Sequence, residues 1–568
     1  MASVTIGTCS GKNLNIYGEA RSTHMHVLGI SGQGKSYFLE QTIREDILNG
    51  HGVCVIDPHG ELYDNLSRWI VENNIDSYRK VHLLNPSHGA WTFGWNPLCT
   101  ENGLSLSARV NAMVDAFVKV WGGGDMSQTP RLRKCLEAVL YALAYNKLSL
   151  AEARFLTRLQ YKDIAKQLTA DLGDEQYEDL WHEFLYEYPD RTFIEYFDST
   201  ISRLLPFVGD PVIRQIVGQT ENLLNFRECM DDRHIVLINL GRGRNLTDES
   251  SKLLGALLTT DMYNSAFGRD VAYAQATPFY VTIDECADYV TDTIAKSLDQ
   301  TRKFGLHLTL SHQRLWQLRE YGDNLYNAVM ANAQIKVVFK VGDDETADVM
   351  SRHLFRREFD LELPKHVLDK PIVVGYDVIW LHSESETAAH LTGMGEGSGT
   401  STGLGSGLSQ MFGTDGSELG GYTQIQNENE GLQTSVSYFT SESSASSSGR
   451  SETLMPQLQV LPTATYSLEE LVHFGMHALL SLPKRQAYVY SPELKPQRFS
   501  TKHLETASIL NRAVDRAVDS IGQASAYSLT HRVALNAIMS RRDGLFERYA
   551  PQNKFIEDDD YDPDSYME

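Results

Sequence analysis

The segment Gly29–Ser36, with the sequence GISGQGKS, constrains the fold more than any other part of this chain. It matches the pattern GxxxxGK followed by Ser or Thr, and it lies between an apolar run, HMHVLGI, and a helical run from Lys35 to Leu48. In this strand, turn and helix context the pattern indicates a phosphate-binding loop (P-loop), because backbone N–H groups and a helix N-terminus can surround phosphate oxygens. The sequence therefore predicts a nucleotide-binding α/β domain.

The residues of the P-loop divide the binding of ATP and Mg²⁺ between them. Lys35 is expected to reach the β and γ phosphates, and the Ser36 hydroxyl is expected to ligate the magnesium ion. The predicted nucleotide-binding residues are Gly29, Ser31, Gly32, Gln33, Gly34, Lys35 and Ser36. The alternative is a chance glycine turn. A second ATPase motif elsewhere in the chain would argue against this alternative.

Such a partner motif lies far downstream, where the apolar run Phe279–Ile283 is followed by Asp284 and Glu285. A buried strand that ends in two carboxylates predicts that Asp284 holds the magnesium ion and that Glu285 polarises the attacking water. The alternative is an ordinary strand end with two solvated acids. Together with the P-loop, the pair favours hydrolysis of ATP over phosphoryl transfer to a small acceptor.

Two further side chains are candidates for contact with the γ-phosphate. Gln313 ends the strand-like run LHLTLSHQ, where RecA-like motors keep a polar residue that senses this phosphate. Arg302 leads into the same run and could act as an arginine finger in a neighbouring subunit. The alternatives are a solvent-facing polar strand end for Gln313 and a cation at a helix end for Arg302.

Two other segments follow apolar runs but favour no particular chemistry. The turn Asp57–Gly60 contains Asp, Pro and Gly, and such a turn needs no function. Arg242 and Arg244 could form a second finger or a DNA-facing loop, and a solvated turn is the favoured interpretation.

Apolar and helical runs alternate from His24 to Pro86 and again from His234 to about Leu354, which is typical of a parallel sheet with crossover helices. We predict an α/β fold: a RecA-like P-loop ATPase core with a mainly parallel sheet, a helical insertion and a small C-terminal α+β unit. The predicted boundaries are 1–103 for the P-loop half of the core, 104–230 for the insertion, 231–392 for the second half of the core, 393–455 for a Gly/Ser-rich flexible linker, 456–550 for the C-terminal unit and 551–568 for an acidic tail.

Charge and cysteine usage limit the partners and the compartment. The formal net charge of −23 repels nucleic acid at long range, so any contact with DNA is expected to be local and shielded. The six cysteines form no CxxC pair, which suits neither a zinc site nor a disulfide scaffold, and we expect reduced thiols in a cytoplasmic protein. No run reaches the length of a membrane helix, so no direct membrane insertion is expected.

Several segments in order resemble the HerA and FtsK superfamily, in particular HerA-like proteins and conjugative coupling ATPases of the TraG and TraD kind. These segments are HVLGISGQGKS, VIDPHGEL, WNPL, VTIDECADYV, TRKFGLHLTLSHQ and ANAQIKVVFKVGDDETA. The resemblance implies a ring, usually of six subunits, with ATP at the subunit interfaces and a central channel for DNA. It also implies that Arg302 acts in trans and that Gln313 senses the phosphate.

These observations predict a ring-forming ATP hydrolase that translocates DNA. One alternative is a HerA-like ring that assembles and regulates a partner nuclease or other effector in defence against mobile DNA. Another is a coupling motor of secretion or conjugation. Hydrolysis stimulated by duplex DNA would favour the first, and loss of a partner on removal of the C-terminal unit and acidic tail would favour the second.

Overall fold

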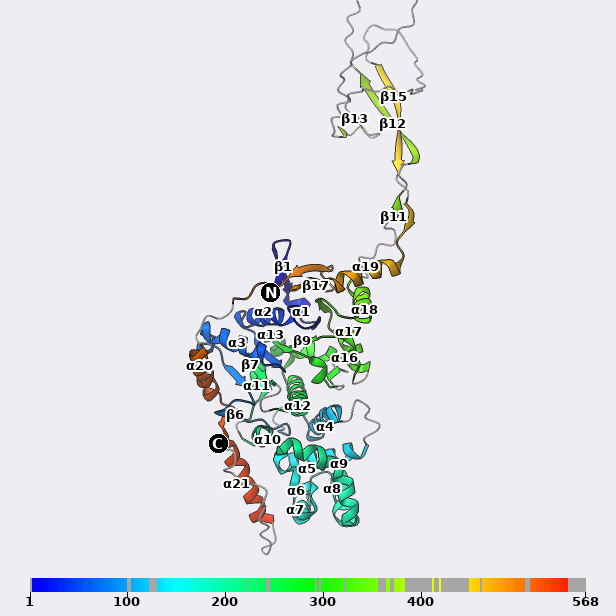
Figure 1. Cartoon of the computed structure of the whole chain (residues 1–568). Helices are drawn as coiled ribbons and strands as arrows, with labels where there is room; N and C mark the ends of the chain where they lie inside the picture. The colour runs from blue at the N-terminus through cyan, green and yellow to red at the C-terminus, as the bar shows by residue number, and fades with distance from the viewer. Residues whose placement is uncertain are drawn as a thin grey trace, which may run out of the picture. The chain divides into compact units, whose positions relative to one another are not determined.

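A computed structural model gives the fold of the chain (Figure 1), and it describes residues 3–99, 104–121, 130–221, 223–241, 246–291, 294–295, 298–320, 323–355, 364–367, 372–383, 411–412, 418–419, 449–459, 462–505 and 511–549. The chain divides into two compact units. The first contains Met1–Phe359 and Leu471–Glu568, and the second contains Asp360–Glu470.

The first unit is built on a large sheet whose central strands are parallel, in the order β10, β3, β9, β8, β4, β7, β5. These strands are β3 (Met25–Leu28), β4 (Gly52–Asp57), β5 (Val81–Leu84), β7 (Ile235–Asn239), β8 (Phe279–Ile283), β9 (Leu306–His312) and β10 (Ile335–Val338). Their residues are almost all buried, as expected for parallel strands that are covered on both faces. The predicted α/β class with a mainly parallel sheet is confirmed.

Four antiparallel strands extend this sheet beyond β10, in the order β17, β18, β1, β2. They are β1 (Ser3–Cys9), β2 (Lys12–Tyr17), β17 (Gln486–Tyr490) and β18 (Gln497–Ser500). The β17–β18 hairpin comes from the segment 456–550, for which the sequence predicted a small C-terminal unit. Its strands belong to the main sheet, because β17 pairs directly with β10, with Val489 opposite Val337.

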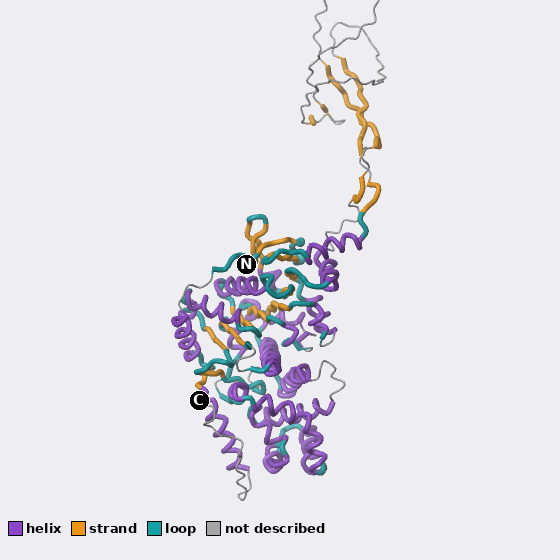
Figure 2. The backbone as a smooth tube through the Cα atoms, viewed as in Figure 1, coloured by secondary structure: helices purple, strands orange, loops and turns teal. Residues whose placement is uncertain are grey.

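The sheet separates two hydrophobic cores, and helices surround its strands (Figure 2). Along β4, Val53 and Val55 belong to one core and Cys54 and Ile56 to the other, because successive side chains point to opposite faces. The first core contains α2 (Lys35–Leu48), α3 (Glu61–Glu72) and part of α20 (Asn511–Ala524). The second contains α11 (Phe226–Asp231) and α12 (Asp248–Phe267).

The described elements between Leu106 and Asp231 are all helices, and most of them gather at the end of this unit away from β1 and β17 (Figure 1). They are α4 (Leu106–Trp121), α5 (Pro130–Tyr145), α6 (Arg154–Thr157), α7 (Lys162–Leu168), α8 (Glu175–His182), α9 (Asp190–Gly209) and α10 (Pro211–Val217), followed by α11. They lie in the segment for which we predicted a helical insertion, 104–230.

A buried polar cluster fastens this helical part to the core. Asp261 on α12 accepts hydrogen bonds from Arg109 Nη1 on α4 at 2.8 Å and from Trp95 Nε1 at 2.9 Å. All three side chains are almost fully buried. A buried charge pair of this kind is costly to break, because one partner is then left without compensation.

The remaining elements of the first unit are further helices and two small strands. The helices are α1 (Gly18–Arg21), α13 (Val271–Ala276), α15 (Leu298–Thr301), α16 (Leu315–Arg319), α17 (Asp323–Asn332), α18 (Asp344–Phe355), α19 (Leu468–Leu480, which begins at the end of the second unit) and α21 (His531–Tyr549). Strand β6 (Trp91–Phe93) pairs with β19 (Ser528–Thr530), so the C-terminal part of the chain also contacts the residues around Trp91. None of the helices in the described ranges is long and apolar enough to cross a membrane.

The second unit contains three antiparallel strand pairs within its described residues. They are β12 (Ile372–Ser383) with β15 (Gly449–Gln459), β11 (Pro364–Val367) with β16 (Pro462–Thr465), and β13 (Met411–Phe412) with β14 (Glu418–Leu419). The predicted second half of the ATPase core, 231–392, extends beyond the first unit, whose earlier part ends at Phe359. The predicted linker, 393–455, lies mostly outside the described residues, as does the predicted acidic tail.

Candidate active site

The predicted site residues meet where parallel strands of the main sheet end. The P-loop follows β3, the carboxylates of Asp284 and Glu285 follow β8, and Gln313 follows β9, which lies between β3 and β8. Because these strands are parallel, their carboxyl ends lie at the same edge of the sheet. This edge is where open α/β sheets bind ligands.

The backbone of the P-loop has the form that the glycine pattern predicts. Gly32 and Gly34 have φ values of +76° and +111°, in the region that favours glycine, and Gly34 caps the N-terminus of α2. Ser31, Gly32 and Ser36 are exposed, and Gln33 is half-buried. The loop therefore presents its backbone and the start of α2 to solvent, where phosphate oxygens can approach.

Close packing also requires glycine at the first position of the loop. A Cβ atom on Gly29 would lie 2.5 Å from Cβ of Phe339, and the Ile30 backbone N–H donates a hydrogen bond to Lys340 O at 3.0 Å. The loop is thus fixed against the residues that follow β10.

Lys35 connects the loop to the carboxylates of β8. Its ammonium group is buried and donates a hydrogen bond to Gly29 O. Burial lowers the pKa of Lys35, and the nearby Asp284 and Glu285 carboxylates oppose that shift. The ammonium group is therefore held between the P-loop backbone and the carboxylates that follow β8.

Asp284 and Glu285 are both only 9% exposed, and their backbone is tightly fixed. The Asp284 N–H donates to Ile56 O of β4 at 3.1 Å, and the Glu285 N–H donates to Asp284 Oδ1 at 3.2 Å. Glu285 has a φ of +48°, an unusual value for a non-glycine residue. Backbone strain of this kind gathers at functional sites, where it fixes the direction of a side chain.

Two amides hold the Glu285 carboxylate. Gln313 Nε2 donates to Oε1 at 2.6 Å, and Gln317 Nε2 on α16 donates to Oε2 at 3.4 Å. Burial raises the pKa of Glu285, while the hydrogen bond from Gln313 acts in the opposite direction. A carboxylate that is partly desolvated and held at both oxygens is suited to act as a base toward a bound water. The sequence did not indicate Gln317.

A buried histidine pair fixes the strand that carries Gln313. His312, the last residue of β9, lies with its Nε2 atom 2.6 Å from Nε2 of His26 on β3, and the two rings are stacked at 4.8 Å. Burial lowers the pKa of both imidazoles. A neutral imidazole pair thus connects the strand before the P-loop to the strand before Gln313.

The Asp57–Gly60 turn, for which the sequence required no function, lies beside this site. Asp57 ends β4, next to β8, and its carboxylate accepts hydrogen bonds from the backbone N–H groups of His59 and Tyr63, each at 2.9 Å. Burial raises the pKa of Asp57, and the Asp284 carboxylate adds to that shift. The sequence feature that could have indicated this location is the position of Asp57 at the end of a second buried strand.

Arg485 is a residue at the P-loop that the sequence did not indicate. Its backbone N–H donates to Gln33 O at 2.7 Å, and a Cβ atom on Gly34 would lie 3.1 Å from Arg485 Cα. Its guanidinium donates to Lys502 O at 2.6 Å and lies over the ring of Tyr37. The start of β17 therefore supports the P-loop from the side.

Arg302 does not join these residues. It lies in a single turn of 3₁₀ helix, Arg302–Phe304, before β9, and it lines a pocket of about 340 Å³ with Thr23, Gln334 and Glu493. The P-loop follows the carboxyl end of β3, whereas Arg302 precedes the amino end of the parallel β9. Arg302 therefore lies away from the nucleotide site of its own chain, and its role in trans remains a prediction. Arg242 and Arg244 lie outside the described residues.

The exposed and buried oxygens of the site fit a magnesium ion. The Ser36 hydroxyl is at the exposed start of α2, and the Asp284 carboxylate accepts only the short-range bond from Glu285 N–H among the hydrogen bonds described for it. Hydroxyl and carboxylate oxygens are ligands that Mg²⁺ prefers. The roles of Ser36, Asp284, Glu285 and the P-loop residues in binding and hydrolysis remain predictions.

Family comparisons give matches in both halves of the chain. Residues 4–192 match the model described as helicase HerA, central domain, and residues 278–359 match the model described as the TraM recognition site of TraD and TraG. Among curated proteins, the uncharacterized protein aq_aa31 of Aquifex aeolicus (strain VF5) is 36% identical over 75 residues, which are 12% of this chain and 28% of that protein. The match thus spans less than a third of that relative's length.

Solved structures of a conjugative coupling protein have a similar fold. TrwBdeltaN70 in its unbound monoclinic form superimposes with a TM-score of 0.50 at 15% identity, covering 90% of this chain and 90% of that chain. TrwB in complex with a non-hydrolysable ATP analogue also gives a TM-score of 0.50, at 14% identity, covering 90% of this chain and 91% of that chain. With its complete P-loop, its HerA and TraD/TraG matches and this fold, the chain resembles P-loop ATPases of the HerA type and the TraG and TraD coupling ATPases.

Proposed function

We propose that the chain hydrolyses ATP with Mg²⁺ at Lys35, Asp284 and Glu285, within a ring that translocates DNA. The observation that carries the first part is the convergence of these residues at the carboxyl ends of the neighbouring strands β3, β9 and β8. Among the similar structures is TrwB in complex with a non-hydrolysable ATP analogue, which supports nucleotide binding by this chain.

The P-loop binds the phosphates through its exposed backbone at Ser31 and Gly32 and through the N-terminus of α2. Lys35, whose ammonium group bonds to Gly29 O in this structure, turns to the β and γ phosphates when they are present. Ser36 and Asp284 would hold the magnesium ion, which supplies neutralisation of the phosphate charge.

Glu285 orients the attacking water and accepts its proton. Gln313 holds Oε1 of the carboxylate at 2.6 Å, so Oε2, with the longer bond of 3.4 Å from Gln317, is the freer oxygen for water. Gln313 also follows the strand beside that of the P-loop. When ATP is bound, its amide can donate to the γ-phosphate in place of Glu285, and the Glu285 carboxylate is then released.

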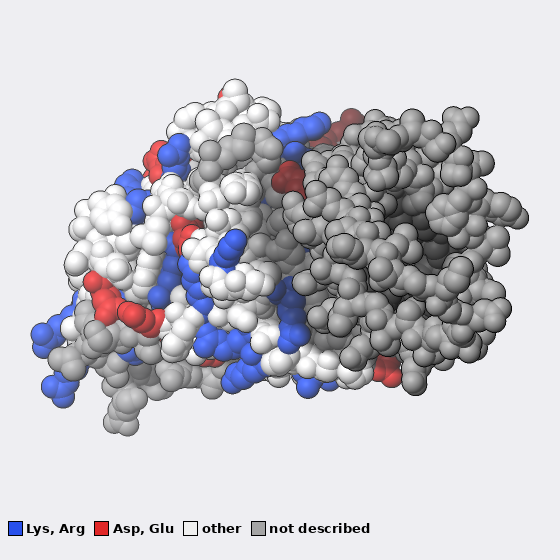
Figure 3. Space-filling model, turned by 90° about the horizontal axis from the view of Figure 1, so that it is seen from above, with Lys and Arg blue, Asp and Glu red and all other residues white. Residues whose placement is uncertain are grey.

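A local basic surface beside the P-loop supports contact with DNA despite the overall negative charge. Five Lys or Arg residues and two Glu residues lie between Lys484 and Glu505, and Lys484, Lys495 and Arg498 are exposed. Figure 3 views the molecule from the end that carries β1 and β17, and Lys and Arg side chains are spread over the described part of that face among fewer Asp and Glu side chains. Phosphate contacts by such side chains supply most of the non-specific affinity for DNA.

The position of Arg302 supports a ring. Because it lies at the opposite ends of the strands from its own P-loop, its guanidinium can reach a γ-phosphate only in a neighbouring subunit. We expect a hexamer, measured as particle mass with and without a nucleotide analogue. A mass of one chain in both conditions would exclude the trans role of Arg302.

Conjugative coupling is the second candidate for the work that the ring performs. It is favoured by the match of residues 278–359 to the TraD and TraG model and by the likeness to a conjugative coupling protein over most of both chains. In this case the DNA is passed to a partner machinery.

The decisive experiment is the ATPase rate of the full chain with and without duplex DNA. DNA is expected to raise the rate, and replacement of Lys484, Lys495 and Arg498 by Gln is expected to reduce that stimulation. The logarithm of the observed DNA-binding constant falls linearly with the logarithm of salt concentration, and each removed cation should reduce the steepness of that line by about 1. The matched control replaces the exposed Lys147, Arg158 and Arg191 of the helical part by Gln, which removes the same number of cations. A rate indifferent to every DNA tested would exclude DNA translocation.

A further inference from the structure

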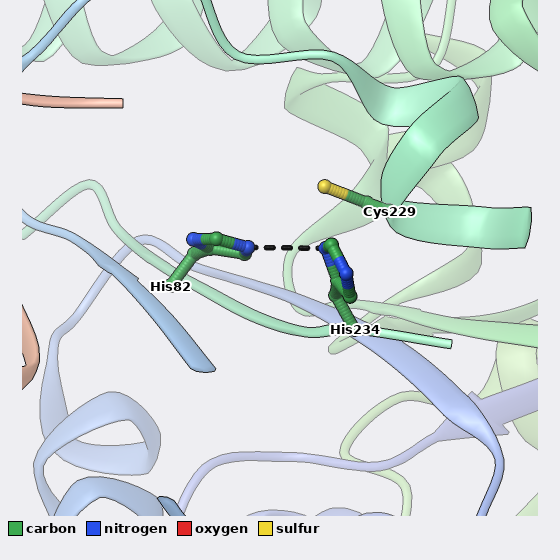
Figure 4. Close-up of side chains that lie close together, drawn as sticks. All are labelled: His82, Cys229 and His234. Carbon is green, nitrogen blue, oxygen red and sulfur yellow. Dashed lines mark hydrogen bonds between the residues drawn. The ribbon is translucent and has the colours of Figure 1, made fainter. Parts of the chain in front are cut away.

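A cluster of metal-binding side chains lies at the opposite ends of the strands from the nucleotide site. His82 is on β5, His234 immediately precedes β7, and Cys229 is on α11 (Figure 4). All three side chains are buried, and their ligand atoms lie within 4.8 Å of one another. The Cys229 thiol points toward the two imidazole rings in Figure 4.

The distances are close to those of a tetrahedral metal site. His82 Nε2 and His234 Nδ1 are 3.1 Å apart. Zinc bonds of 2.0–2.1 Å to nitrogen and 2.3 Å to sulfur at tetrahedral angles place two nitrogens about 3.3 Å apart and a nitrogen and a sulfur about 3.6 Å apart. Small side-chain rotations are therefore enough to bring all three atoms around one ion.

One of the two outer histidine nitrogens has a hydrogen-bond partner of the kind that ligating histidines usually have. His82 Nδ1 lies 2.9 Å from Ser525 Oγ. His234 Nε2 is buried without a hydrogen bond, and the carboxylate of Asp232 lies 3.8 Å from it. A carboxylate or hydroxyl on the outer nitrogen fixes the tautomer that leaves the inner nitrogen free to bind a metal.

Carboxylates lie beside the cluster and can supply further ligand atoms. Glu228 and Asp232 offer carboxylates that lie with His234 in a second group of ligand atoms within 4.8 Å of one another. Lys80 and Arg79 are the opposing cations, and the Lys80 ammonium group is largely exposed and 4.0 Å from the Glu228 carboxylate. The carboxylates thus balance the two cations beside the histidine pair.

We propose that His82, Cys229 and His234 bind one Zn²⁺ ion, with water in the fourth position. Nitrogen and thiolate ligands in this combination select zinc over the hard Mg²⁺ ion of the nucleotide site. The ion would fasten α11 to the edge of the sheet formed by β7 and β5, beside Ser525 and Tyr527 of the C-terminal part. Its binding would be independent of the P-loop, which lies at the other ends of the strands.

The first experiment measures the zinc content of the full chain, purified without chelator, by elemental mass spectrometry. We expect about one Zn²⁺ per chain in the wild type and in the Lys35→Ala variant, and a loss of most of it in Cys229→Ser. The matched control is Cys135→Ser, which changes a cysteine that is equally buried in the helical part and should keep the ion. Equal zinc content in Cys229→Ser and in the wild type would overturn the proposal.

The second experiment adds Co²⁺ alone, as a spectroscopic probe, to the chain from which bound metal has been removed. Tetrahedral thiolate ligation should give a sulfur-to-cobalt charge-transfer band that is absent from Cys229→Ser. Ser525→Ala leaves the three ligands in place and should weaken the binding of Co²⁺ by about 10-fold, so it tests the site even where Cys229→Ser does not fold. Absence of the band in the folded wild type would show that His82 and His234 form only a hydrogen-bonded pair.

Discussion

Replacing Glu285 by Gln tests the hydrolytic role of this side chain with little change in its shape. The carboxylate accepts hydrogen bonds from Gln313 at 2.6 Å and from Gln317 at 3.4 Å. The amide that replaces it can still accept the shorter bond through its oxygen, but its NH₂ group then faces the NH₂ group of Gln317 across the longer distance. The variant should therefore keep the architecture of the site and lose the base.

The size of the effect follows from what the carboxylate contributes. Removal of a positioned general base lowers kcat by about 10²–10⁴-fold. Nucleotide affinity should change little, because the P-loop and Lys35 make the proposed phosphate contacts. The variant is thus expected to hold ATP without turning it over.

The same substitution should stabilise the fold at neutral pH. Burial raises the pKa of Glu285 in the folded chain, so the protonated form is favoured there and ionisation costs stability. Any stability that this group contributes is present at low pH and is lost as the pH rises through the raised pKa. Glu285→Gln removes the ionisable group and with it this loss of stability. The melting temperature of the variant should therefore exceed that of the wild type at neutral pH, and the difference should vanish in acid.

Two assays check these expectations. Steady-state hydrolysis and retention of labelled ATP on gel filtration separate turnover from binding, and thermal unfolding at several pH values follows stability. Asp284→Asn is the comparison, because it should weaken magnesium-dependent binding as well as turnover. A Glu285→Gln variant that hydrolyses ATP at the wild-type rate would refute the assignment of the base.

Three further substitutions test other contacts. Lys35→Ala should weaken ATP binding itself, and titration with a fluorescent analogue that gave wild-type affinity would contradict the proposed phosphate contact. Gly34→Ala puts a side chain at a φ of +111° and 3.1 Å from Arg485 Cα. The resulting strain in the P-loop backbone, about 1–2 kcal/mol, corresponds to a loss of roughly 5–30-fold in affinity for the ATP analogue in the same titration. Asp261→Ala leaves Arg109 buried without its partner, and should lower the free energy of unfolding by about 3–5 kcal/mol in denaturant titrations; a change below about 1 kcal/mol would show that the pair is not important for stability.

The sequence indicated residues that the structure brings to one edge of the sheet because each motif is continuous. The P-loop, the Asp284–Glu285 pair and Gln313 each follow an apolar run, and runs that alternate with helices form a parallel sheet whose carboxyl ends meet. The same rule applies to Asp57. Its position after a buried strand indicates that it lies beside the candidate site, whereas the composition of its turn does not. The cysteines show the limit of spacing as a signal, because Cys229 meets His82 and His234 only through the packing of α11 on the sheet edge.

Contacts between distant parts of the chain were not accessible from local patterns. Arg485 supports Gln33 across more than four hundred residues, because β17 pairs with β10 and so places its first residues beside the P-loop. A chain that ended before Lys484 would keep every motif that the sequence predicts, yet β10 would lose its antiparallel partner and the P-loop would lose a backbone donor. The C-terminal part is therefore structurally continuous with the nucleotide site.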